Sequence, residues 1–339
     1  MSSGNNNLIT IIIPVYNAAR FIADCIESII NQSVEYWELL LVDDGSIDGS
    51  SEICDKYAQC NKKIRVIHQA NGGPGKARNT GINACNTTWF TFVDADDKIG
   101  ERYIENFHVE QCENDCVLSC QGFVRVDTTG KTLGEEYNLK DKVYKGERFI
   151  DHAFCESDLY SFGQSVGKLY NKTLCDRYNI RLNTSFSWSE DHLFYLQYLL
   201  HIDEIKTHSG CLYFYQYAAG QQTLTHRPLP YKEAIKIFHN IYPAADALVR
   251  QYDLSSSAMV KKIYYHSVTA GFSIVLRNLY REEQDKSERR MVLRLLRKDM
   301  RQMREKYNPH GVKGKIIKPL LLWLPINLLD TMFSKIISR

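Results

Sequence analysis

The stretch Trp89-Phe90-Thr91-Phe92-Val93-Asp94-Ala95-Asp96-Asp97 places three carboxylates directly after a short apolar segment. Its first five residues are aromatic or β-branched, which predicts a buried β-strand. Like charges at a strand end are unfavourable unless a positive group lies beside them. Mg²⁺ or Mn²⁺ is the simplest such group, because both take hard oxygen ligands and leave positions for phosphate oxygens. For an Asp-x-Asp tripeptide alone, the alternative interpretation is a solvated acidic turn that caps the next helix.

The residues before this stretch alternate between apolar segments and segments of helical periodicity. Strands are predicted at residues 8–13, 37–42 and 64–68, and helices at about 19–30, 50–60 and 76–85. This alternation predicts an α/β fold with a parallel, doubly wound sheet. The loops after the strands then lie at one edge, where a single ligand could contact them all. No G-x-G-x-x-G follows the first strand, so a dinucleotide site has little support.

Beyond Gly100 the pattern is less regular. It predicts a helix at 103–112, strands at 117–126 and 212–217, a hairpin return through Thr129-Gly130, and a helix at 193–200. Glu190-Asp191 precede that last helix, where the helix dipole alone would stabilise carboxylates. From about residue 231 onward the chain is predicted to be helical.

Charge is distributed unevenly along the 339 residues. The formal net charge is +2, but residues 286–339 hold 14 Lys/Arg and only 4 Asp/Glu. From Lys313 to Arg339 this tail carries an amphipathic stripe of Leu329, Met332, Phe333, Ile336 and Ile337. A basic amphipathic segment predicts contact with an anionic membrane surface. Packing of the stripe against protein is the alternative.

The ten cysteines are scattered and form no C-x-x-C pair. Cys112, Cys116 and Cys120 are evenly spaced, but the strand predicted over residues 117–123 makes helical zinc ligation there unfavourable. Free thiols and a polar start without a signal-peptide core predict a cytoplasmic protein. Because no uncharged run is long enough to span a bilayer, a membrane location would be peripheral, on the inner face of the cytoplasmic membrane.

Four motifs in order carry a family resemblance. They are Ile13-Pro14-Val15-Tyr16-Asn17; Leu41-Val42-Asp43-Asp44-Gly45-Ser46 with Asp48-Gly49-Ser50; Asn71-Gly72-Gly73 with Ala77-Arg78-Asn79-Thr80-Gly81; and Val93-Asp94-Ala95-Asp96-Asp97. Together they resemble the family 2 glycosyltransferases of GT-A fold, of the bacterial surface-polysaccharide type. The resemblance is dense over residues 8–100, continues through Gly167-Lys168-Leu169-Tyr170 and Glu190-Asp191, and fades beyond about 220. It implies a Rossmann-like, mostly parallel sheet with a helical C-terminal extension.

The resemblance also implies roles for individual residues. The nucleotide-sugar-binding set would be Pro14, Tyr16, Asn17, Asp44, Gly72, Gly73, Arg78, Asp94 and Ala95. Tyr16 is similar to the residue that stacks on the base, and Asp44 to the carboxylate that accepts the uracil N–H. Glycines permit close approach to the diphosphate, and Arg78 adds positive charge there. Asp94 resembles the carboxylate on the ribose side.

Two further carboxylates are given chemical roles by the same resemblance. Asp96 looks like the ligand of Mg²⁺ or Mn²⁺, and Asp191 like the catalytic base. Asp43 would support its loop or act only as a turn former, and Arg78 could instead be a surface ion-pair partner. The usual Arg-Ser-Gly-Ser form of the acceptor loop is absent at Thr223-Leu224-Thr225-His226-Arg227.

The resemblance implies an inverting, metal-dependent hexosyltransferase whose donor is a nucleotide sugar, with a UDP-sugar expected. The basic tail favours a glycan or lipid-linked glycan as the acceptor. Residues 1–100 would bind the donor, 101–220 the acceptor, and 221–339 would form the helical region with the basic tail. Nucleic acid is not an expected partner. A nucleotidyltransferase is the first alternative, although Pro14-Val15-Tyr16-Asn17 supplies no basic triphosphate loop. A non-catalytic nucleotide-sugar-binding module is the second, favoured if Asp191 lies far from the metal site.

Overall fold

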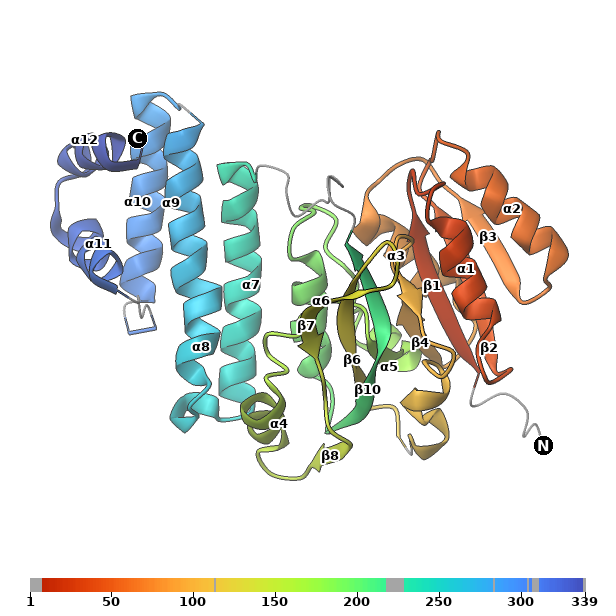
Figure 1. Cartoon of the computed structure of the whole chain (residues 1–339). Helices are drawn as coiled ribbons and strands as arrows, with labels where there is room; N and C mark the ends of the chain where they lie inside the picture. Colours follow the sequence, from red (N-terminus) through yellow and green to blue (C-terminus); the bar gives the residue numbers. More distant parts are fainter. Residues whose placement is uncertain are drawn as a thin grey trace. The chain divides into compact units, whose positions relative to one another are not determined.

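The computed structural model describes residues 8–112, 114–217, 229–282, 284–303, 305–306 and 311–337. The chain divides into two compact units, Met1–Thr223 and Leu224–Arg339. The first contains the sheet and the second is helical (Figure 1). Among the described residues, no helix is both long enough and apolar enough to cross a bilayer.

The first unit is built on a ten-stranded sheet. Its N-terminal strands are β1 (Ile9–Val15), β2 (Trp37–Asp43), β3 (Ile64–His68) and β4 (Trp89–Phe92), which run parallel in the order β3-β2-β1-β4. Residues on both faces of β1, β2 and β4 are buried, as in a parallel sheet covered by helices on both sides. The predicted parallel, doubly wound arrangement is confirmed for this half of the sheet.

Three helices connect these strands: α1 (Ile22–Ile30), α2 (Ser50–Cys60) and α3 (Pro74–Ala84). Cys25, Ile26 and Ile29 form the buried face of α1. Helix α3 lies so close to β1 that a Cβ atom added at Gly81 would be 2.3 Å from Cγ2 of Ile12. Because only glycine permits this approach, Gly81 sets how closely α3 packs against β1.

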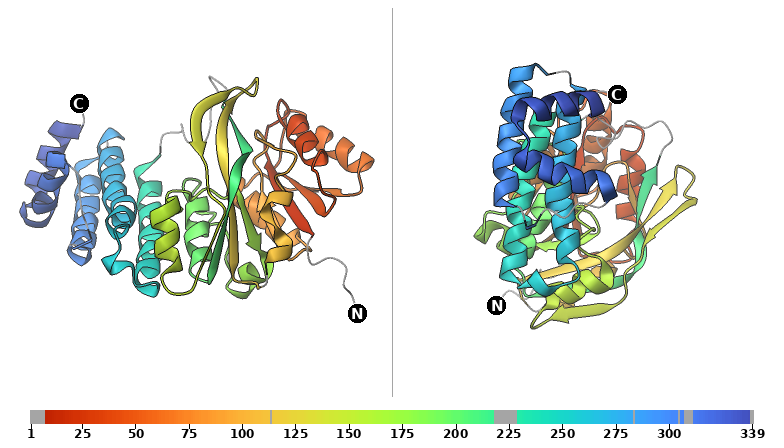
Figure 2. Two further views of the ribbon diagram at one scale, coloured as in Figure 1. Left: turned by 60° about the horizontal axis from the view of Figure 1, so that its bottom comes forward. Right: turned by 90° about the vertical axis from the view of Figure 1, so that its left-hand side faces the viewer.

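The second half of the sheet is mixed. Strand β9 (Lys168–Asn171) lies antiparallel between β4 and β6 (Val117–Asp127), and β10 (Glu204–Tyr217) runs parallel to β6. The remaining strands pair antiparallel with these: β5 (Lys98–Ile99) and β8 (Lys142–Lys145) with β10, and β7 (Thr132–Tyr137) with β6. The left view of Figure 2 shows β6, β7 and β10 side by side.

Residues 103–112 differ from the prediction of one helix. They form two short 3₁₀ turns, Glu105–Phe107 and Val109–Gln111, separated by His108. His108 has a φ of +46°, in the left-handed region that a continuous right-handed helix does not contain. The helical periodicity was present, but the backbone reverses its hand at this single residue.

Helices α4 (Phe149–Ser157), α5 (Lys172–Arg177) and α6 (Glu190–Leu199) complete the first unit. Aromatic packing holds α6 against the sheet, because the ring of Phe194 lies 5.1 Å from Tyr170 and 6.2 Å from Phe92. The hydroxyl of Tyr198 accepts from Asn171 N–H at 2.8 Å and donates to the Val117 carbonyl at 2.9 Å. These contacts fix the position of the first turn of α6 relative to the end of β4.

The second unit contains α7 (Tyr231–Gln251), α8 (Val260–Tyr264), a π-helical turn Tyr265–Ala270, α9 (Gly271–Arg281), α10 (Lys286–Gln302), α11 (Gly311–Trp323) and α12 (Ile326–Ile337). Helices α7, α9 and α10 lie side by side, and α11 and α12 pack against α10 (Figures 1 and 2). Their core includes Phe238, Phe272 and Leu296. The helical region predicted beyond residue 231 is confirmed.

Candidate active site

The loops after β1 and β2 form the first part of the site. Tyr16 directly follows β1 and is 51% exposed, so its ring is not part of the core. Asn17 has a φ of +49°, and its side-chain oxygen accepts from Ile47 N–H at 2.9 Å. The N–H of Asn17 donates to Ser46 Oγ at 3.1 Å. These bonds tie the two loops together and leave the Tyr16 ring accessible to a planar ligand.

The two aspartates at the end of β2 are both buried but make different contacts. Asp43 accepts from Ser46 N–H at 3.0 Å, Ser51 Oγ at 2.5 Å and His68 Nδ1 at 3.0 Å. Burial alone would raise the pKa of Asp43, but the bonds from Ser46, Ser51 and His68 outweigh it and lower that pKa. Asp43 therefore stays ionised and supports its own loop, one of the two roles foreseen for it.

Asp44 holds the glycine loop that precedes α3. Its carboxylate accepts from Gly72 N–H at 2.9 Å, from Gly73 N–H at 2.7 Å and from Gln69 Nε2 at 2.6 Å. Gly73 has a φ of +86°, a conformation that side-chain-bearing residues rarely adopt, and Pro74 follows as the first residue of α3. The N–H of Gly72 also lies 3.1 Å from the second carboxylate oxygen, so Asp44 holds the glycine loop through both of its oxygens.

The three carboxylates of the acidic turn after β4 lie in different environments. Asp97 is buried and accepts from the Tyr213 hydroxyl at 2.6 Å and from Gln216 N–H at 2.8 Å. The Tyr213 oxygen in turn accepts from Asp94 N–H at 3.1 Å. Burial, with the charges of Asp96 and Asp94, raises the pKa of Asp97. Asp97 thus fastens the turn to β10, a role that sequence reasoning did not assign.

Arg78 on α3 connects this turn to the far side of the site. Its side chain is buried, and Nη2 donates to Asp94 Oδ1 at 2.6 Å. Nη1 lies 3.8 Å from Glu190 Oε1, at the first residue of α6. Its Nε has no hydrogen-bond partner among the described residues. The alternative that Arg78 is a surface ion-pair partner is wrong, because its guanidinium lies inside the site between two carboxylates.

Glu190 and Asp191 begin α6 after Ser189, whose φ is +63°. Glu190 is 6% exposed, and burial together with the charge of Asp191 raises its pKa to about 7. Asp191 is half-buried; burial raises its pKa as well, while the charge of Arg78 acts in the opposite direction. A carboxylate of raised pKa accepts a proton more readily than an ordinary aspartate, which suits a general base.

Lys168 on β9 lies near these carboxylates and was given no role from sequence. It is fully buried, donates from Nζ to the Gln164 carbonyl at 2.6 Å, and lies 3.5 Å from the centre of the Phe162 ring. Burial lowers the pKa of Lys168 to about 7, although the charges of Cys120 and Asp191 oppose this shift. Its contacts hold the segment before β9 in place.

The residues present fit a divalent cation at Asp96. Asp94 is bound to Arg78 and Asp97 to Tyr213 and Gln216. Asp96 is half-exposed at the turn. Within the described ranges, no three His, Cys, Asp or Glu side chains gather into a group that could hold a metal. One carboxylate suits Mg²⁺ or Mn²⁺ bound together with phosphate oxygens, since Mg²⁺ commonly takes one or two carboxylates plus substrate phosphates.

The structure brings most of the predicted residues to one edge of the sheet. Asp44, Gly72 and Gly73 are bonded to one another, and Arg78 joins Asp94 to the helix that carries Asp191. Pro14 lies within β1, two residues before Tyr16, and Ala95 lies in the turn with Asp96. His226 lies outside the described residues.

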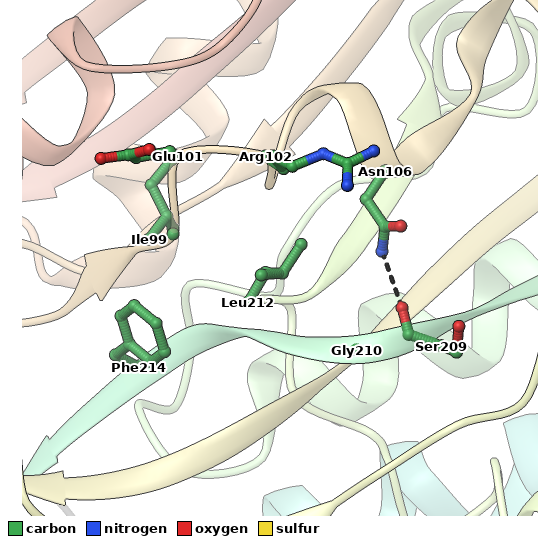
Figure 3. A pocket seen from close by; sticks show the side chains of 9 residues that line it. Ile99, Glu101, Arg102, Asn106, Ser209, Gly210, Leu212 and Phe214 are labelled. Carbon is green, nitrogen blue, oxygen red and sulfur yellow. Dashed lines mark hydrogen bonds between the residues drawn. The ribbon is translucent and has the colours of Figure 1, made fainter.

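A separate pocket of about 670 Å³ lies on the other side of β10 (Figure 3). Leu212 and Phe214 line it, whereas Tyr213 between them bonds Asp97, and alternate side chains of a strand point to opposite faces. Asn106 spans the pocket wall by donating to the Ser209 carbonyl at 3.1 Å. The pocket is therefore behind the aspartate turn rather than in the candidate site.

Comparisons with known proteins agree with this geometry. Residues 10–178 match the family model described as glycosyl transferase family 2. The chain is 30% identical over 251 residues to the uncharacterized glycosyltransferase EpsJ of Bacillus subtilis, covering 74% of this chain and 72% of EpsJ. It is 27% identical over 226 residues to the minor teichoic acid biosynthesis protein GgaA of B. subtilis, covering 65% of this chain and about half (49%) of GgaA.

Among solved structures, the fold resembles residues 1–349 of S. aureus TarS, crystallised in complex with UDP-GlcNAc. The TM-score is 0.67 with 18% sequence identity, covering 98% of this chain and 90% of the TarS chain. This likeness confirms the GT-A-type α/β fold with its helical C-terminal region.

Proposed function

The chain belongs to glycosyl transferase family 2, and we propose that it transfers a hexosyl group from a UDP-sugar to a hydroxyl of a glycan during synthesis of a surface polysaccharide. The observation that carries this proposal is the position of Arg78. Its guanidinium binds Asp94 at 2.6 Å and lies 3.8 Å from Glu190 at the start of α6. The strand ends that suit a nucleotide donor and the carboxylates that suit a base therefore adjoin one another.

In this proposal the loops of β1 and β2 bind the nucleotide. The exposed Tyr16 ring stacks on the base, and Asp44, which also holds Gly72 and Gly73, accepts the uracil N–H. The diphosphate lies near the N-terminus of α3, where main-chain N–H groups and the helix dipole favour negative charge. Arg78 keeps the donor side and the first turn of α6 at a fixed separation.

Asp191 takes the proton of the acceptor hydroxyl as that oxygen attacks the anomeric carbon and the diphosphate leaves. Burial raises the pKa of Asp191, which strengthens its carboxylate as a base. Asp96 would hold Mg²⁺ or Mn²⁺, which when bound supplies a Lewis acid for the charge on the leaving diphosphate. Inversion at the anomeric carbon follows from a single displacement of this kind.

The acceptor we propose is a glycan on a lipid carrier, with the enzyme at the inner face of the cytoplasmic membrane. Two relatives support a surface polymer: GgaA is named for teichoic acid synthesis and TuaG of B. subtilis for teichuronic acid synthesis. The basic composition of residues 286–339 supports a site beside anionic lipid.

A panel of nucleotide sugars tests the donor assignment. A ligand that binds only the folded state raises apparent stability by about 2.7 kcal/mol at one hundred times its Kd. We expect at least one UDP-sugar, with Mg²⁺ or Mn²⁺ present, to raise the unfolding temperature and to be hydrolysed slowly. If ADP- or GDP-sugars protect while every UDP-sugar does not, the UDP assignment is wrong.

A substitution at Asp96 tests the proposed metal ligand. Asp96→Ala should lose the part of UDP protection that a chelator removes from the wild type, because the half-exposed carboxylate at the turn is gone. Asp203→Ala, at an exposed aspartate before β10, is the matched control and should behave as the wild type. Equal metal-dependent protection in Asp96→Ala and wild type would remove Asp96 from the site.

A further inference from the structure

The amphipathic stripe of the tail is directed mostly into protein. Leu329 and Phe333 are buried at 0% and 3% exposure in the core of the second unit, and Met332 packs against the same cluster. Ile336 is 64% exposed. The stripe that suggested membrane contact therefore mainly anchors α12 to its own unit, and any outer contact must use other residues.

A second set of residues faces outward from α10. Met291, Arg294, Lys298 and Arg301 are exposed and recur at helical spacing, so they share one face of the helix. Every exposed residue within α10 is Lys, Arg, Ser, Met or Gln. Among the described residues, Arg294, Lys298 and Arg301 enter no ion pair, in contrast to Arg289 and its partner Asp330.

An exposed aromatic corner adjoins this basic face. Trp323 ends α11 and is 76% exposed, and Leu328 in the first turn of α12 is 52% exposed. Arg297 of α10 donates to the carbonyls of Leu321 (2.7 Å) and Leu324, on either side of Trp323. Because Arg297 stands between Arg294 and Arg301 on the same helix, this bond brings the corner beside the cations.

Two acids of these helices, Asp330 and Asp299, are buried rather than exposed. Asp330 is the only acid of residues 311–337, and it is buried against Arg289 at 2.6 Å and Arg290 at 3.6 Å. Asp299 is likewise buried, bonded to His239. Glu305, four residues after Arg301, is exposed, but no ion pair joins it to Arg294, Lys298 or Arg301 among the described residues.

We propose that the surface formed by Arg294, Lys298, Arg301, Trp323 and Leu328, called here the docking face, binds an anionic lipid bilayer. Uncompensated cations attract anionic headgroups, and an exposed Trp beside Leu suits the interfacial zone, where aromatic rings prefer to lie. The inference rests on the proposed function in one respect: a lipid-linked acceptor is presented at such a surface. It replaces the stripe of residues 329–337 as the membrane contact.

Sedimentation of the full-length chain with vesicles tests the docking face. The protein should pellet with phosphatidylglycerol-containing vesicles, far less with pure phosphatidylcholine, and be partly released at high salt. Each cation near an anionic surface contributes roughly fivefold in affinity, so Arg294→Gln/Lys298→Gln/Arg301→Gln should bind about 100-fold more weakly. Trp323→Ala should weaken binding while leaving its salt dependence intact.

The matched control removes three exposed cations of the first unit, as Lys131→Gln/Lys140→Gln/Lys145→Gln, and should bind vesicles like the wild type. Equal losses in the two triple variants would mean that net charge alone drives binding and would overturn the docking face. The docking face would also be overturned if the α10 triple variant bound vesicles as tightly as the wild type. A third contrary result would be a protein that pellets without lipid and forms a dimer in light scattering, with Trp323→Ala abolishing that dimer.

UDP-sugar protection, measured on the same samples, separates the two proposals. The α10 triple variant should keep full protection because its substitutions lie in the other unit. A wild type that is protected by UDP-sugars but ignores anionic vesicles refutes the docking face alone. A wild type that binds vesicles but no nucleotide sugar refutes the proposed function and leaves the docking face standing.

Discussion

The buried carboxyl of Glu190 destabilises the folded state when it is ionised, and Glu190→Gln should remove this destabilisation. Burial and the charge of Asp191 raise its pKa from 4.5 to about 7. A raised pKa means that the folded state favours the protonated carboxyl. Its contribution to stability is therefore complete below pH 4.5, declines as pH rises, and is lost above about pH 7.

The magnitude follows from the shift. One unit of pKa shift corresponds to about 1.36 kcal/mol. The rise in the pKa of Glu190 from 4.5 to about 7 therefore corresponds to about 3 kcal/mol in the free energy of unfolding. Glutamine resembles the protonated acid and cannot ionise. Glu190→Gln should thus be about 3 kcal/mol more stable than wild type at pH 8, and within about 1 kcal/mol of it at pH 5.

Urea unfolding at both pH values measures this difference, provided that the signal reports only the first unit. Trp37, Trp89 and Trp188 lie in that unit and Trp323 in the other, so the comparison is made in a Trp323→Phe background. Glu147→Gln, at an exposed site, is the control and should follow the wild type at both pH values. If Glu190→Gln is instead less stable than wild type at pH 8, the ion pair with Arg78 outweighs burial and the reasoning is wrong.

Three further variants test the rest of the site and its support. Asp191→Asn should lower kcat by about 10²-fold or more with little change in donor KM, and a matching loss of donor affinity would make Asp191 a donor-side residue. Tyr16→Ala should weaken UDP-sugar binding in titration without changing the unfolding temperature, because the ring is 51% exposed. Gly81→Ala should cost about 1–3 kcal/mol in urea unfolding, since its Cβ would lie 2.3 Å from Ile12, and an unchanged midpoint would refute that close packing.

The first half of the sheet could be predicted because its signal is local. Strands β1, β2 and β4 are apolar on both faces, and each connection is a helix of ordinary length. The preference for right-handed crossovers then leaves few arrangements. The acidic turn follows β4 and the glycine loop follows β3, so their meeting at one edge of the sheet was also foreseeable.

The order of the strands in the second half of the sheet could not be predicted from the sequence in the same way. Strand β9 enters between β4 and β6, although it begins 41 residues after the end of β6 and 76 residues after the end of β4. Strand β5 has only two residues, too few for any periodicity. His108, a single residue in the left-handed conformation, interrupts residues 103–112, which the sequence pattern predicts to be one helix. Such features depend on contacts distant in sequence, which a pattern of apolar residues does not contain.

The candidate site could likewise be predicted from the sequence only in part. Sequence motifs placed Arg78 near the donor and Asp191 in a catalytic pair, but gave no contact between residues 78 and 190. That contact exists because the rings of Phe92, Tyr170 and Phe194 hold α6 against the strand ends. An aromatic core thus sets the distance between two charged groups, Arg78 and Glu190.

The tail illustrates what an amphipathic pattern does determine. The spacing of Leu329 and Phe333 correctly indicated one apolar face of a helix, and that face is buried in the second unit. Spacing alone does not distinguish lipid from protein as the covering partner, because both are apolar. The distinguishing observation is charge. Asp330 is paired inside the unit, whereas Arg294, Lys298 and Arg301 enter no ion pair within the described ranges, so it is α10 that presents uncompensated charge to an anionic partner.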